Sequence, residues 1–403
     1  MKNAVDADNL EMAKVLLESF PDLKASFDAV NLAASNGRAD ILALMFSRNA
    51  TTSYDLIRSA LEHGHLELAQ WLVPRVNKVA SATWIRAAVK GGSLQAVQWV
   101  YNLQPRCDGI SSGAIDAAVK VGIVEMVRWL LERFQGFVDM ARVVRSAVMD
   151  TAAGNGHLEM VKWLHAHRTE GGTREAMDSA AVSGHLEVVE WLHANRVAGC
   201  TTQAVDGAAK NGYIDVKWLL QNRSEGCSPR AINSAAAGGH LEIVQWLTNY
   251  GKTCTTDAMD VAACNGHLHV VKWLHANRSE GCTTQAMDEA AKNGHLDIVQ
   301  WLHRNRSEGC SGNGSHCAMD VAAGHGHLEI VKWLHENRTE GCTTDAMDCA
   351  ARNGYLEVVQ WLHFNRQEGC TTRGVDEAAQ NGFLEVVKWL LENRLEGCST
   401  NAM

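Results

Sequence analysis

Hydrophobic and polar positions along the chain follow a unit of about 28 residues, which is most regular between Cys282 and Gly309. Its first half groups small apolar residues and closes on an Asn-Gly pair, which is typical of a short helix capped by a left-handed glycine. Its second half spaces larger apolar residues along one helical face: Leu296, Ile298, Val299, Trp301 and Leu302. The unit therefore predicts two short antiparallel helices, helix A followed by helix B, and no strand.

Two consecutive threonines mark the start of helix A. We expect Thr283 to be the N-cap and Thr284 the first helical residue, because a threonine hydroxyl can accept a hydrogen bond from a free amide of the first turn. Another unit holds Ser228 and Pro229 at these two positions, and proline is tolerated at the first position of a helix. The turn glycine Gly294 then separates helix A from helix B.

The unit recurs along nearly the whole sequence. The tryptophan of helix B is found at Trp71, Trp99, Trp129, Trp163, Trp191, Trp218, Trp246, Trp273, Trp301, Trp333, Trp361 and Trp389. The turn glycine adds an earlier copy at Gly37, and a half-unit precedes it around Asn9 to Leu17. Neither short helix can bury its apolar face alone, so neighbouring units must cover each other. We predict an all-α fold, an α-solenoid of about 13 full repeats of stacked antiparallel helix pairs with partial units at both ends.

The regularity of the unit changes along the chain. Copies within residues 1–135 keep the glycine and the tryptophan but lose most other identities, whereas copies within residues 136–403 are nearly identical. We interpret these as two regions of one continuous solenoid. The stretch from Gly212 to Trp218 is one residue short, and we expect a later start of helix B there. Both ends of the sequence cut through a unit, as expected for part of a longer protein.

Composition and charge narrow the functional classes. The formal net charge is −9, from 37 Lys and Arg against 46 Asp and Glu, which disfavours a polyanion as the general partner. No window of about eighteen apolar residues suggests a membrane span, and the first residues lack the apolar block of a secretory signal. We expect a cytoplasmic or nuclear monomer that is not secreted and does not bind membranes. Its 12 cysteines are expected to be reduced thiols.

One stretch of the unit resembles a known family. Ala350 to Leu362 reads Ala-Ala-Arg-Asn-Gly-Tyr-Leu-Glu-Val-Val-Gln-Trp-Leu, and most copies have His where Tyr355 stands. This pattern resembles the centre of the ankyrin repeat. The unit is about five residues shorter than the usual ankyrin repeat, and the missing residues are those of the projecting β-hairpin finger. The resemblance implies that helix A lines a concave side and that the chain is a protein-binding adaptor.

Several repeated side chains are expected to be structural. The tryptophans lie on the apolar face of helix B, and we assign them to the core. The cysteines that precede the helix A caps, such as Cys282, are interpreted as small buried fillers. Stacked units place them too far apart for disulfides. The histidine after the turn glycine, such as His295, is expected to close the turn between the two helices.

Two charged rows run along the repeats. Arginines such as Arg306 are followed two residues later by a glutamate, which favours salt links over a track for phosphates. Aspartates such as Asp288 recur in helix A, and we expect them to bond amides or side chains of the adjacent unit. The alternative is that this aspartate row gives the surface a negative potential that attracts a basic protein segment.

No catalytic motif interrupts the repeat. The sequence lacks a Gly-x-Ser-x-Gly elbow, a phosphate-binding Gly-rich Lys loop and a His-Glu-x-x-His zinc motif. Cys310, His316, Cys317 and His325 gather near a four-residue insertion, but their spacing matches no common zinc signature. We therefore expect no enzyme activity, no metal and no cofactor.

Comparison of the copies shows which helix A positions vary. They are spaced i, i+4 and i+7, which places them on one stripe of the helix. The predicted partner-binding residues are Gln203, Gly207, Lys210, Asp257, Val261, Cys264, Gln285, Glu289, Lys292, Asp345, Cys349, Arg352, Arg373, Glu377 and Gln380. We predict a non-catalytic scaffold or adaptor that binds a protein partner along the concave helix A surface. The alternative is a modular nucleic-acid reader, but that function needs a basic or aromatic stripe, which these positions do not show.

Overall fold

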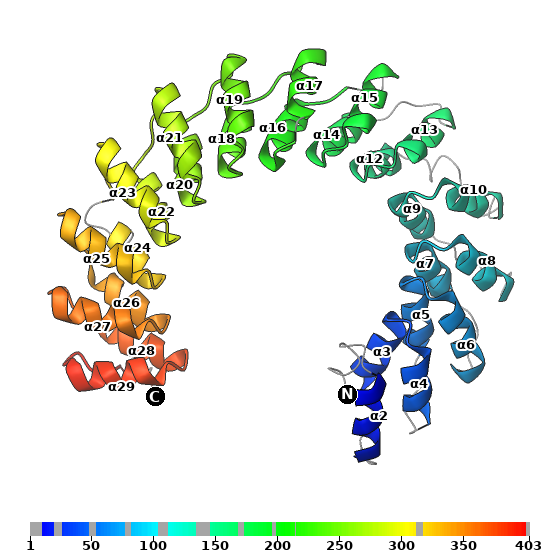
Figure 1. Cartoon of the computed structure of the whole chain (residues 1–403), viewed down its shortest axis with the longest axis horizontal. Coiled ribbons are helices and arrows are strands. Elements are labelled where there is room, and N and C mark those ends of the chain that lie inside the picture. Colours follow the sequence, from blue (N-terminus) through cyan, green and yellow to red (C-terminus); the bar gives the residue numbers. More distant parts are fainter. Residues whose placement is uncertain are drawn as a thin grey trace. The chain divides into compact units, whose positions relative to one another are not determined.

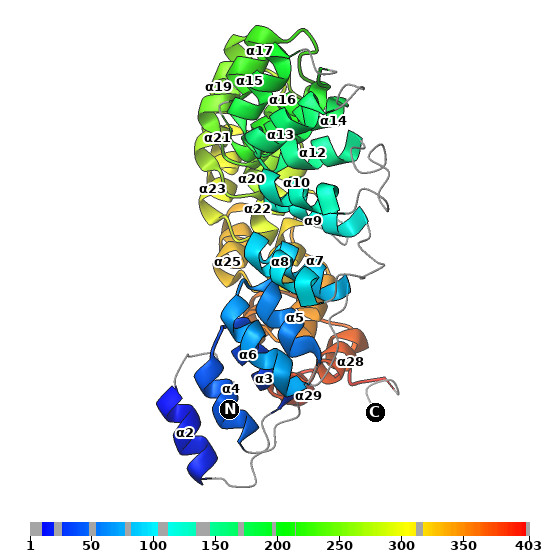
Figure 2. The same cartoon turned by 90° about the vertical axis from the view of Figure 1, so that its right-hand side faces the viewer.

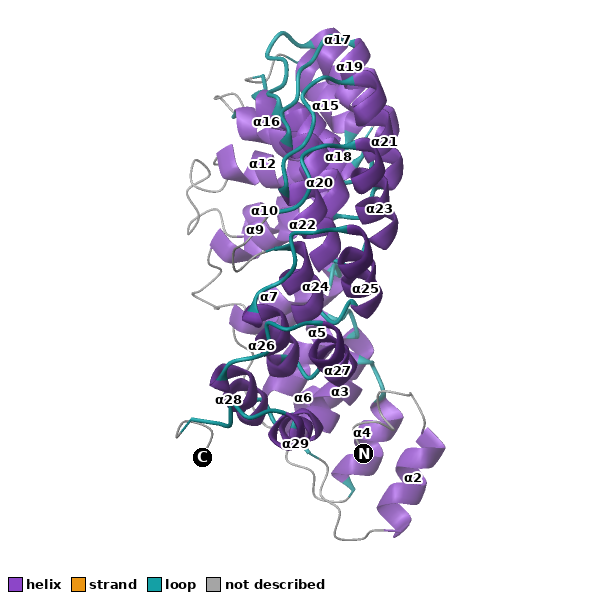
Figure 3. Cartoon of the chain, turned by 90° about the vertical axis from the view of Figure 1, so that its left-hand side faces the viewer, coloured by secondary structure: helices purple, strands orange, loops and turns teal. Residues whose placement is uncertain are grey.

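The computed structural model describes residues 10–19, 26–47, 54–76, 82–103, 112–133, 146–167, 173–195, 199–213, 215–311 and 317–399. All regular structure within these ranges is helical, with 27 helices and no strand (Figure 3). Among these described residues, one helix, α2 (Leu10–Ser19), precedes thirteen pairs of helix A and helix B. The predicted all-α repeat architecture is therefore confirmed for the described part of the chain.

The chain divides into two units, and each is described by itself. The N-terminal unit consists of Met1–Ala180 and His185–Gly199, and the C-terminal unit consists of Ala181–Gly184 and Cys200–Met403. The change in sequence regularity near residue 135 is a separate feature, and the two regions inferred from it stay a prediction.

The N-terminal unit stacks helix A on helix A, since α3 packs against α5, α5 against α7, and α7 against α9 (Figure 1). Its A helices are α3 (Phe27–Ser35), α5 (Tyr54–Glu62), α7 (Ala82–Lys90), α9 (Ser112–Val121), α12 (Ser146–Gly154) and α14 (Arg174–Val182), the last of which ends in the C-terminal unit. Its B helices are α4 (Ala39–Phe46), α6 (Leu66–Val76), α8 (Leu94–Leu103), α10 (Val124–Arg133), α13 (Leu158–Ala166) and α15 (Leu186–Ala194).

The C-terminal unit repeats the same stacking more regularly. Its A helices are α16 (Thr202–Asn211), α18 (Arg230–Ala237), α20 (Asp257–Cys264), α22 (Gln285–Lys292), α24 (Ala318–Gly324), α26 (Thr344–Arg352) and α28 (Thr372–Gln380). Its B helices are α17 (Asp215–Asn222), α19 (Leu241–Asn249), α21 (Leu268–Asn277), α23 (Leu296–Asn305), α25 (Leu328–Asn337), α27 (Leu356–Asn365) and α29 (Leu384–Asn393). Within this unit the A helices form the inner row and the B helices the outer row (Figure 1).

Helix ends follow the capping pattern of the sequence. Thr343 is the N-cap of α26, and its hydroxyl accepts a hydrogen bond from the Asp345 amide at 3.1 Å. The Thr283 hydroxyl accepts in the same way from the Gln285 amide, although α22 itself begins at Gln285. α17 is described from Asp215 onward, and Ile214 lies outside the described residues, so the late start of helix B stays a prediction. The shortened stretch leaves the Asp215 carboxylate 3 % exposed, at a position where other units carry an apolar residue.

The core lies between the two helices of each pair and between neighbouring pairs. In one unit it consists of Ala286, Met287, Ala290, Ala291, Ile298, Val299 and Leu302. The assignment of the tryptophan row to this core was wrong, because each of these tryptophans is only partly buried. Trp301 lies at the edge of the buried face, where its ring meets the His275 ring edge-on at 5.1 Å between centroids. The neighbouring unit covers the centre of the apolar face and leaves its flank in contact with solvent.

The described cysteines are free thiols, as predicted. Of the row that precedes the helix A caps, Cys200, Cys254, Cys282, Cys310 and Cys370 are buried, Cys227 and Cys342 are half-buried, and Cys398 is exposed. Cys107 lies outside the described residues. Most of the row therefore fills space between units, and its exposed end is a thiol at the last described repeat.

The histidine after the turn glycine links two units, so its predicted role in closing its own turn was wrong. The backbone amide of His295 closes that turn by donating to the Ala290 carbonyl at 2.9 Å. The side chain of the equivalent His327 reaches the preceding unit, where Nε2 donates to the Lys292 carbonyl at 3.0 Å. Its ring lies over Gly294, whose φ is +85° and where an added Cβ would be 2.8 Å from the ring. The glycine thus serves both the left-handed turn and the contact between units.

The loop arginines form the salt links expected from the sequence. Arg306 pairs with Glu308 in its own loop, and its Nη1 also donates to Nδ1 of His275 in the preceding unit at 3.4 Å. The same pair with glutamate is formed by Arg223, Arg278, Arg338, Arg366 and Arg394. Arg196 lies outside the described residues. Because these guanidinium groups are committed to neighbouring side chains, the row does not form a free track for phosphates.

Candidate partner-binding surface

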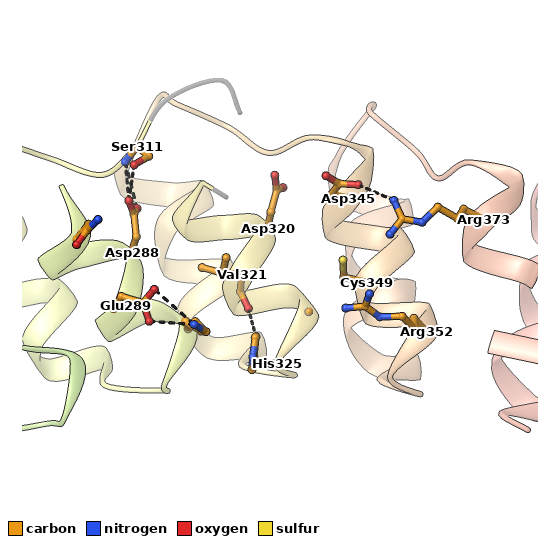
Figure 4. Close-up of a pocket in the computed structure, with 13 residues that line it drawn as sticks. Asp288, Glu289, Ser311, Asp320, Val321, His325, Asp345, Cys349, Arg352 and Arg373 are labelled. Carbon is orange, nitrogen blue, oxygen red and sulfur yellow. Dashed lines mark hydrogen bonds and ion pairs between the residues drawn. The ribbon is translucent and has the colours of Figure 1, made fainter. Parts of the chain in front are cut away.

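A polar groove lies on the helix A row of the C-terminal unit. It has a volume of about 760 Å³ and runs over α22, α24, α26 and α28 (Figure 4). Its lining residues are Gln285, Asp288, Glu289, Lys292, Ser311, Asp320, Val321, Gly324, His325, Asp345, Cys349, Arg352 and Arg373. The A helices of four successive repeats therefore present their variable face to one groove on the inner side of this unit.

The groove brings together seven of the predicted partner-binding residues. They come from three helices and are Gln285, Glu289, Lys292, Asp345, Cys349, Arg352 and Arg373. Glu377 lies beside them on α28, because its carboxylate is 2.9 Å from Nε of Arg373. The remaining predicted residues, on α16, α20 and the end of α28, do not line this groove: Gln203, Gly207, Lys210, Asp257, Val261, Cys264 and Gln380.

Two of these remaining positions take part in packing between neighbouring units. Gly207 has no room for a side chain, because an added Cβ would lie 2.3 Å from Cγ2 of Val182. The Cys264 sulfur accepts a hydrogen bond from Nδ2 of Asn293 at 3.3 Å. Variation between copies at these two positions therefore reflects contacts between units as well as surface chemistry.

The sequence comparison did not single out the part of the groove that α24 supplies. Val321 and Gly324 occupy in α24 the positions that Glu289 and Lys292 occupy in α22. Counting back from the turn glycine of that unit would have found them. Because Val321 and Gly324 are small, α24 forms a low floor between the longer side chains of α22 and α26. His325 borders this floor, and its Nδ1–H donates to the Val321 carbonyl at 2.8 Å.

Charged side chains of both signs line the groove. Glu289 pairs with Lys292 at 3.0 Å along α22, and Arg373 pairs with Glu377 along α28. Arg373 also reaches back to Asp345 on α26 at 3.6 Å, as Figure 4 shows. These pairs are partly exposed, so each contributes little to stability and remains available for exchange with a partner's charges.

The aspartate row has the structural role expected from the sequence. Asp288 accepts hydrogen bonds from the Ser311 amide and hydroxyl, and Asp320 accepts them from the Thr343 amide and hydroxyl at 2.8 Å each. Burial raises the pKa of both carboxyl groups, although the hydrogen bonds from Ser311 and Thr343 oppose this shift. Asp320 thus fixes the N-cap of α26, and both aspartates hold neighbouring units in register.

No group of three or more His, Cys, Asp or Glu side chains among the described residues is placed to hold a metal ion, and His316 lies outside these residues. No described helix is both long and apolar enough to cross a membrane.

Comparisons with known proteins identify the repeat. A family model for ankyrin repeats in three copies matches residues 116–204 and 287–373, and a second model for ankyrin repeats in many copies matches residues 259–303. No curated protein matches the chain significantly. Among solved structures, the pentatricopeptide repeat protein PPR10 from maize is similar over 100 % of this chain and 69 % of that chain, with 11 % sequence identity and a TM-score of 0.36.

Proposed function

The chain belongs to the ankyrin-repeat family, and from this premise we propose that it is a non-catalytic scaffold that binds a protein partner along its helix A row. The observation that carries the proposal is the groove over α22, α24, α26 and α28. It gathers variable residues from successive repeats, whereas the residues that hold the repeats together are nearly identical from copy to copy. A surface of this kind can be changed without changing the fold.

The partner presents a basic segment to this groove. Four carboxylate residues line it, namely Asp288, Glu289, Asp320 and Asp345, against the cationic Lys292, Arg352 and Arg373. Asp288 and Asp320 are committed to hydrogen bonds from Ser311 and Thr343, so Glu289 and Asp345 are the acceptors that a partner's lysine or arginine would meet. The net charge of −9 for the whole chain adds a long-range attraction for a basic segment.

A cytoplasmic or nuclear location and a monomeric state belong to the same proposal. The described cysteines are free, which suits a reducing compartment. A nucleic-acid reader is the alternative, but no described feature of the groove favours it, since no Phe, Tyr or Trp side chain lines the groove and acidic side chains outnumber basic ones.

A charge-exchange variant tests this surface without breaking its own ion pairs. Glu289→Lys combined with Lys292→Glu keeps the pair on α22 but reverses the order of charges that a partner meets. Glu329→Lys combined with Lys332→Glu makes the same exchange on α25, a B helix, and serves as the matched control. Pull-downs with the intact chain and both variants should lose partners only with the α22 exchange. If the intact chain and the α22 variant captured the same partners, the proposal that this groove binds the partner would be refuted.

A titration with a Lys-rich peptide tests the charge of the partner separately. Binding should weaken as salt screens the attraction, and the α22 exchange should weaken it further. If the affinity did not depend on salt concentration, the proposal of a basic partner segment would be refuted, but the scaffold proposal would still stand.

A further inference from the structure

A second, smaller groove lies on the helix A row of the N-terminal unit, between α5 and α7. Figure 2 shows these two helices next to each other. The groove has a volume of about 260 Å³ and is lined by Arg58, Glu62, Thr83, Arg86, Ala87 and Lys90. Three of its side chains are cationic and one is acidic. Its charge is therefore opposite in sign to that of the groove in the C-terminal unit.

The two arginines occupy the position of the aspartate row. Arg58 and Arg86 stand six residues before the turn glycines Gly64 and Gly92, just as Asp288 stands six residues before Gly294. A guanidinium group has no hydrogen-bond acceptor, so it cannot bind the amide and hydroxyl of a helix cap as the aspartates do. In these two consecutive repeats, an arginine that lines the groove therefore stands where other repeats have an aspartate that accepts hydrogen bonds from the next repeat.

The acidic side chains nearby neutralise only part of this positive charge. Glu62 is shared, because Nζ of Lys90 lies 2.7 Å and Nη1 of Arg58 lies 3.4 Å from its carboxylate oxygens. The hydrogen bond from Lys90 lowers the pKa of Glu62, so this carboxylate stays ionised. Asp55, outside the groove lining, is 3.2 Å from Nε of Arg58. Arg86 is exposed on α7 and has no ion pair among the described residues.

We propose that the groove between α5 and α7 binds an acidic segment of a protein partner, with the Arg86 guanidinium as the central contact for a carboxylate. Guanidinium groups bind carboxylates and phosphates through paired N–H donors. Glu62 and Asp55 make the singly charged carboxylate the better fit here, because a phosphate carries close to two negative charges and meets more repulsion from them. No aromatic side chain lines the groove, which disfavours stacking of nucleic-acid bases.

Peptide binding to the full-length chain tests the proposal. A fluorescent Glu-rich peptide is titrated with the protein, and anisotropy is followed at low and at physiological salt. The peptide should bind, and more weakly as salt rises. R86E should weaken binding roughly fivefold to tenfold, since it replaces one attraction by one repulsion. R86K keeps the charge and should lose much less.

The matched control is R128E, which makes the same change on the exposed face of α10, a B helix, and should leave binding unchanged. Circular dichroism confirms that each variant keeps its helical content. Equal affinities of R86E and the unchanged chain would overturn the proposal. Tighter binding of a phosphoserine peptide or of a single-stranded oligonucleotide than of the Glu-rich peptide would overturn it as well. R86E should not change the binding of a Lys-rich peptide to the C-terminal groove. The proposals for the two grooves can therefore be refuted independently of each other.

Discussion

The carboxylate of Asp348 holds the N-cap of the next repeat through both of its oxygens. Oδ1 accepts from the Thr371 amide at 2.8 Å, and Oδ2 accepts from the Thr371 hydroxyl at 2.7 Å. That hydroxyl accepts in turn from the Arg373 amide at 3.2 Å. One side chain of α26 therefore determines where α28 begins, and Arg373, the first groove residue of α28, is positioned by the same set of hydrogen bonds.

Asp348→Ala should destabilise the contact between α26 and α28. Asp348 is only 1 % exposed, and its loss removes two hydrogen bonds to a helix cap, with an expected cost of about 1–3 kcal/mol. Asp345→Ala is the control on the same helix, because Asp345 has only a partly exposed pair with Arg373 at 3.6 Å. Hydrogen exchange should show faster opening of α28 in the first variant alone. Equal protection of α28 in both variants would contradict the structural role of the row.

Gly354→Ala should cost more than Gly382→Ala, although both glycines adopt nearly the same left-handed conformation, with φ of +80° and +78°. An added Cβ at Gly354 would lie 2.5 Å from Cδ1 of Phe383, whereas nothing lies within 4 Å at Gly382. We expect about 1 kcal/mol for the backbone strain at either position, and a further loss at Gly354 from displacement of the Phe383 ring. Urea unfolding followed by circular dichroism measures the difference. Equal losses would show that the ring moves aside without cost.

Trp301→Ala should be less damaging than Leu302→Ala, despite the larger side chain that is removed. Trp301 is only partly buried, so its loss should cost about 1–3 kcal/mol. Leu302 is 1 % exposed, and its loss leaves a cavity, with an expected cost of about 2–5 kcal/mol. Comparison of urea midpoints within this one helix tests the order. A larger loss of stability for Trp301→Ala than for Leu302→Ala would show that Trp301 contributes to the core after all.

Thiol reactivity should follow the burial of the cysteine row. Burial raises the pKa of Cys282, Cys310, Cys342 and Cys370 from 9.0 to about 11, which lowers their thiolate fraction at neutral pH about a hundredfold. Brief treatment of the native chain with iodoacetamide at mildly alkaline pH should therefore modify the exposed Cys398 and spare these four. Peptide mass spectrometry identifies the modified residues, and unfolding in urea should expose all of them. Early modification of Cys282 in the native chain would contradict its burial.

The same pKa shift links folding to pH. The folded state keeps these thiols protonated above pH 9.0, where the unfolded chain begins to release the protons. Since the unfolded state then binds fewer protons, stability should be fully present below pH 9.0 and should fall as pH rises towards about 11. Replacement of these four cysteines by alanine should flatten this decline. An unchanged pH profile would assign the decline to other groups.

The repeated pattern made most of the fold predictable. Turn glycines such as Gly294, cap threonines such as Thr343 and the apolar spacing from Leu296 onward each act over a few residues, and each gave the correct helix boundary to within about a residue. The structural role of the aspartate row was also predictable, because an acidic residue that recurs in most units needs a partner that recurs with it. Asp348 and Thr371 meet this requirement.

Other features could not be predicted, because they depend on how far the neighbouring unit extends over a face. The spacing of Trp301 showed that it shares a face with Leu302, but not that the next repeat covers one and leaves the flank of the other exposed. The histidines of the His327 type looked like local turn residues because they follow the glycine directly. Their rings instead reach the preceding unit.

The amino-acid sequence alone determined the repeat, its helices, their caps and the stripe of variable positions, because hydrogen bonds within a turn and the 3.6-residue helical period are local properties. Only the tertiary structure decided which of these positions meet. The groove over α24 forms where small Val321 and Gly324 lie between the long side chains of α22 and α26, and the groove beside Arg86 exists because α5 and α7 are adjacent. The shape and the charge of each groove depend on side chains from neighbouring helices together, so they cannot be read from the sequence of a single repeat.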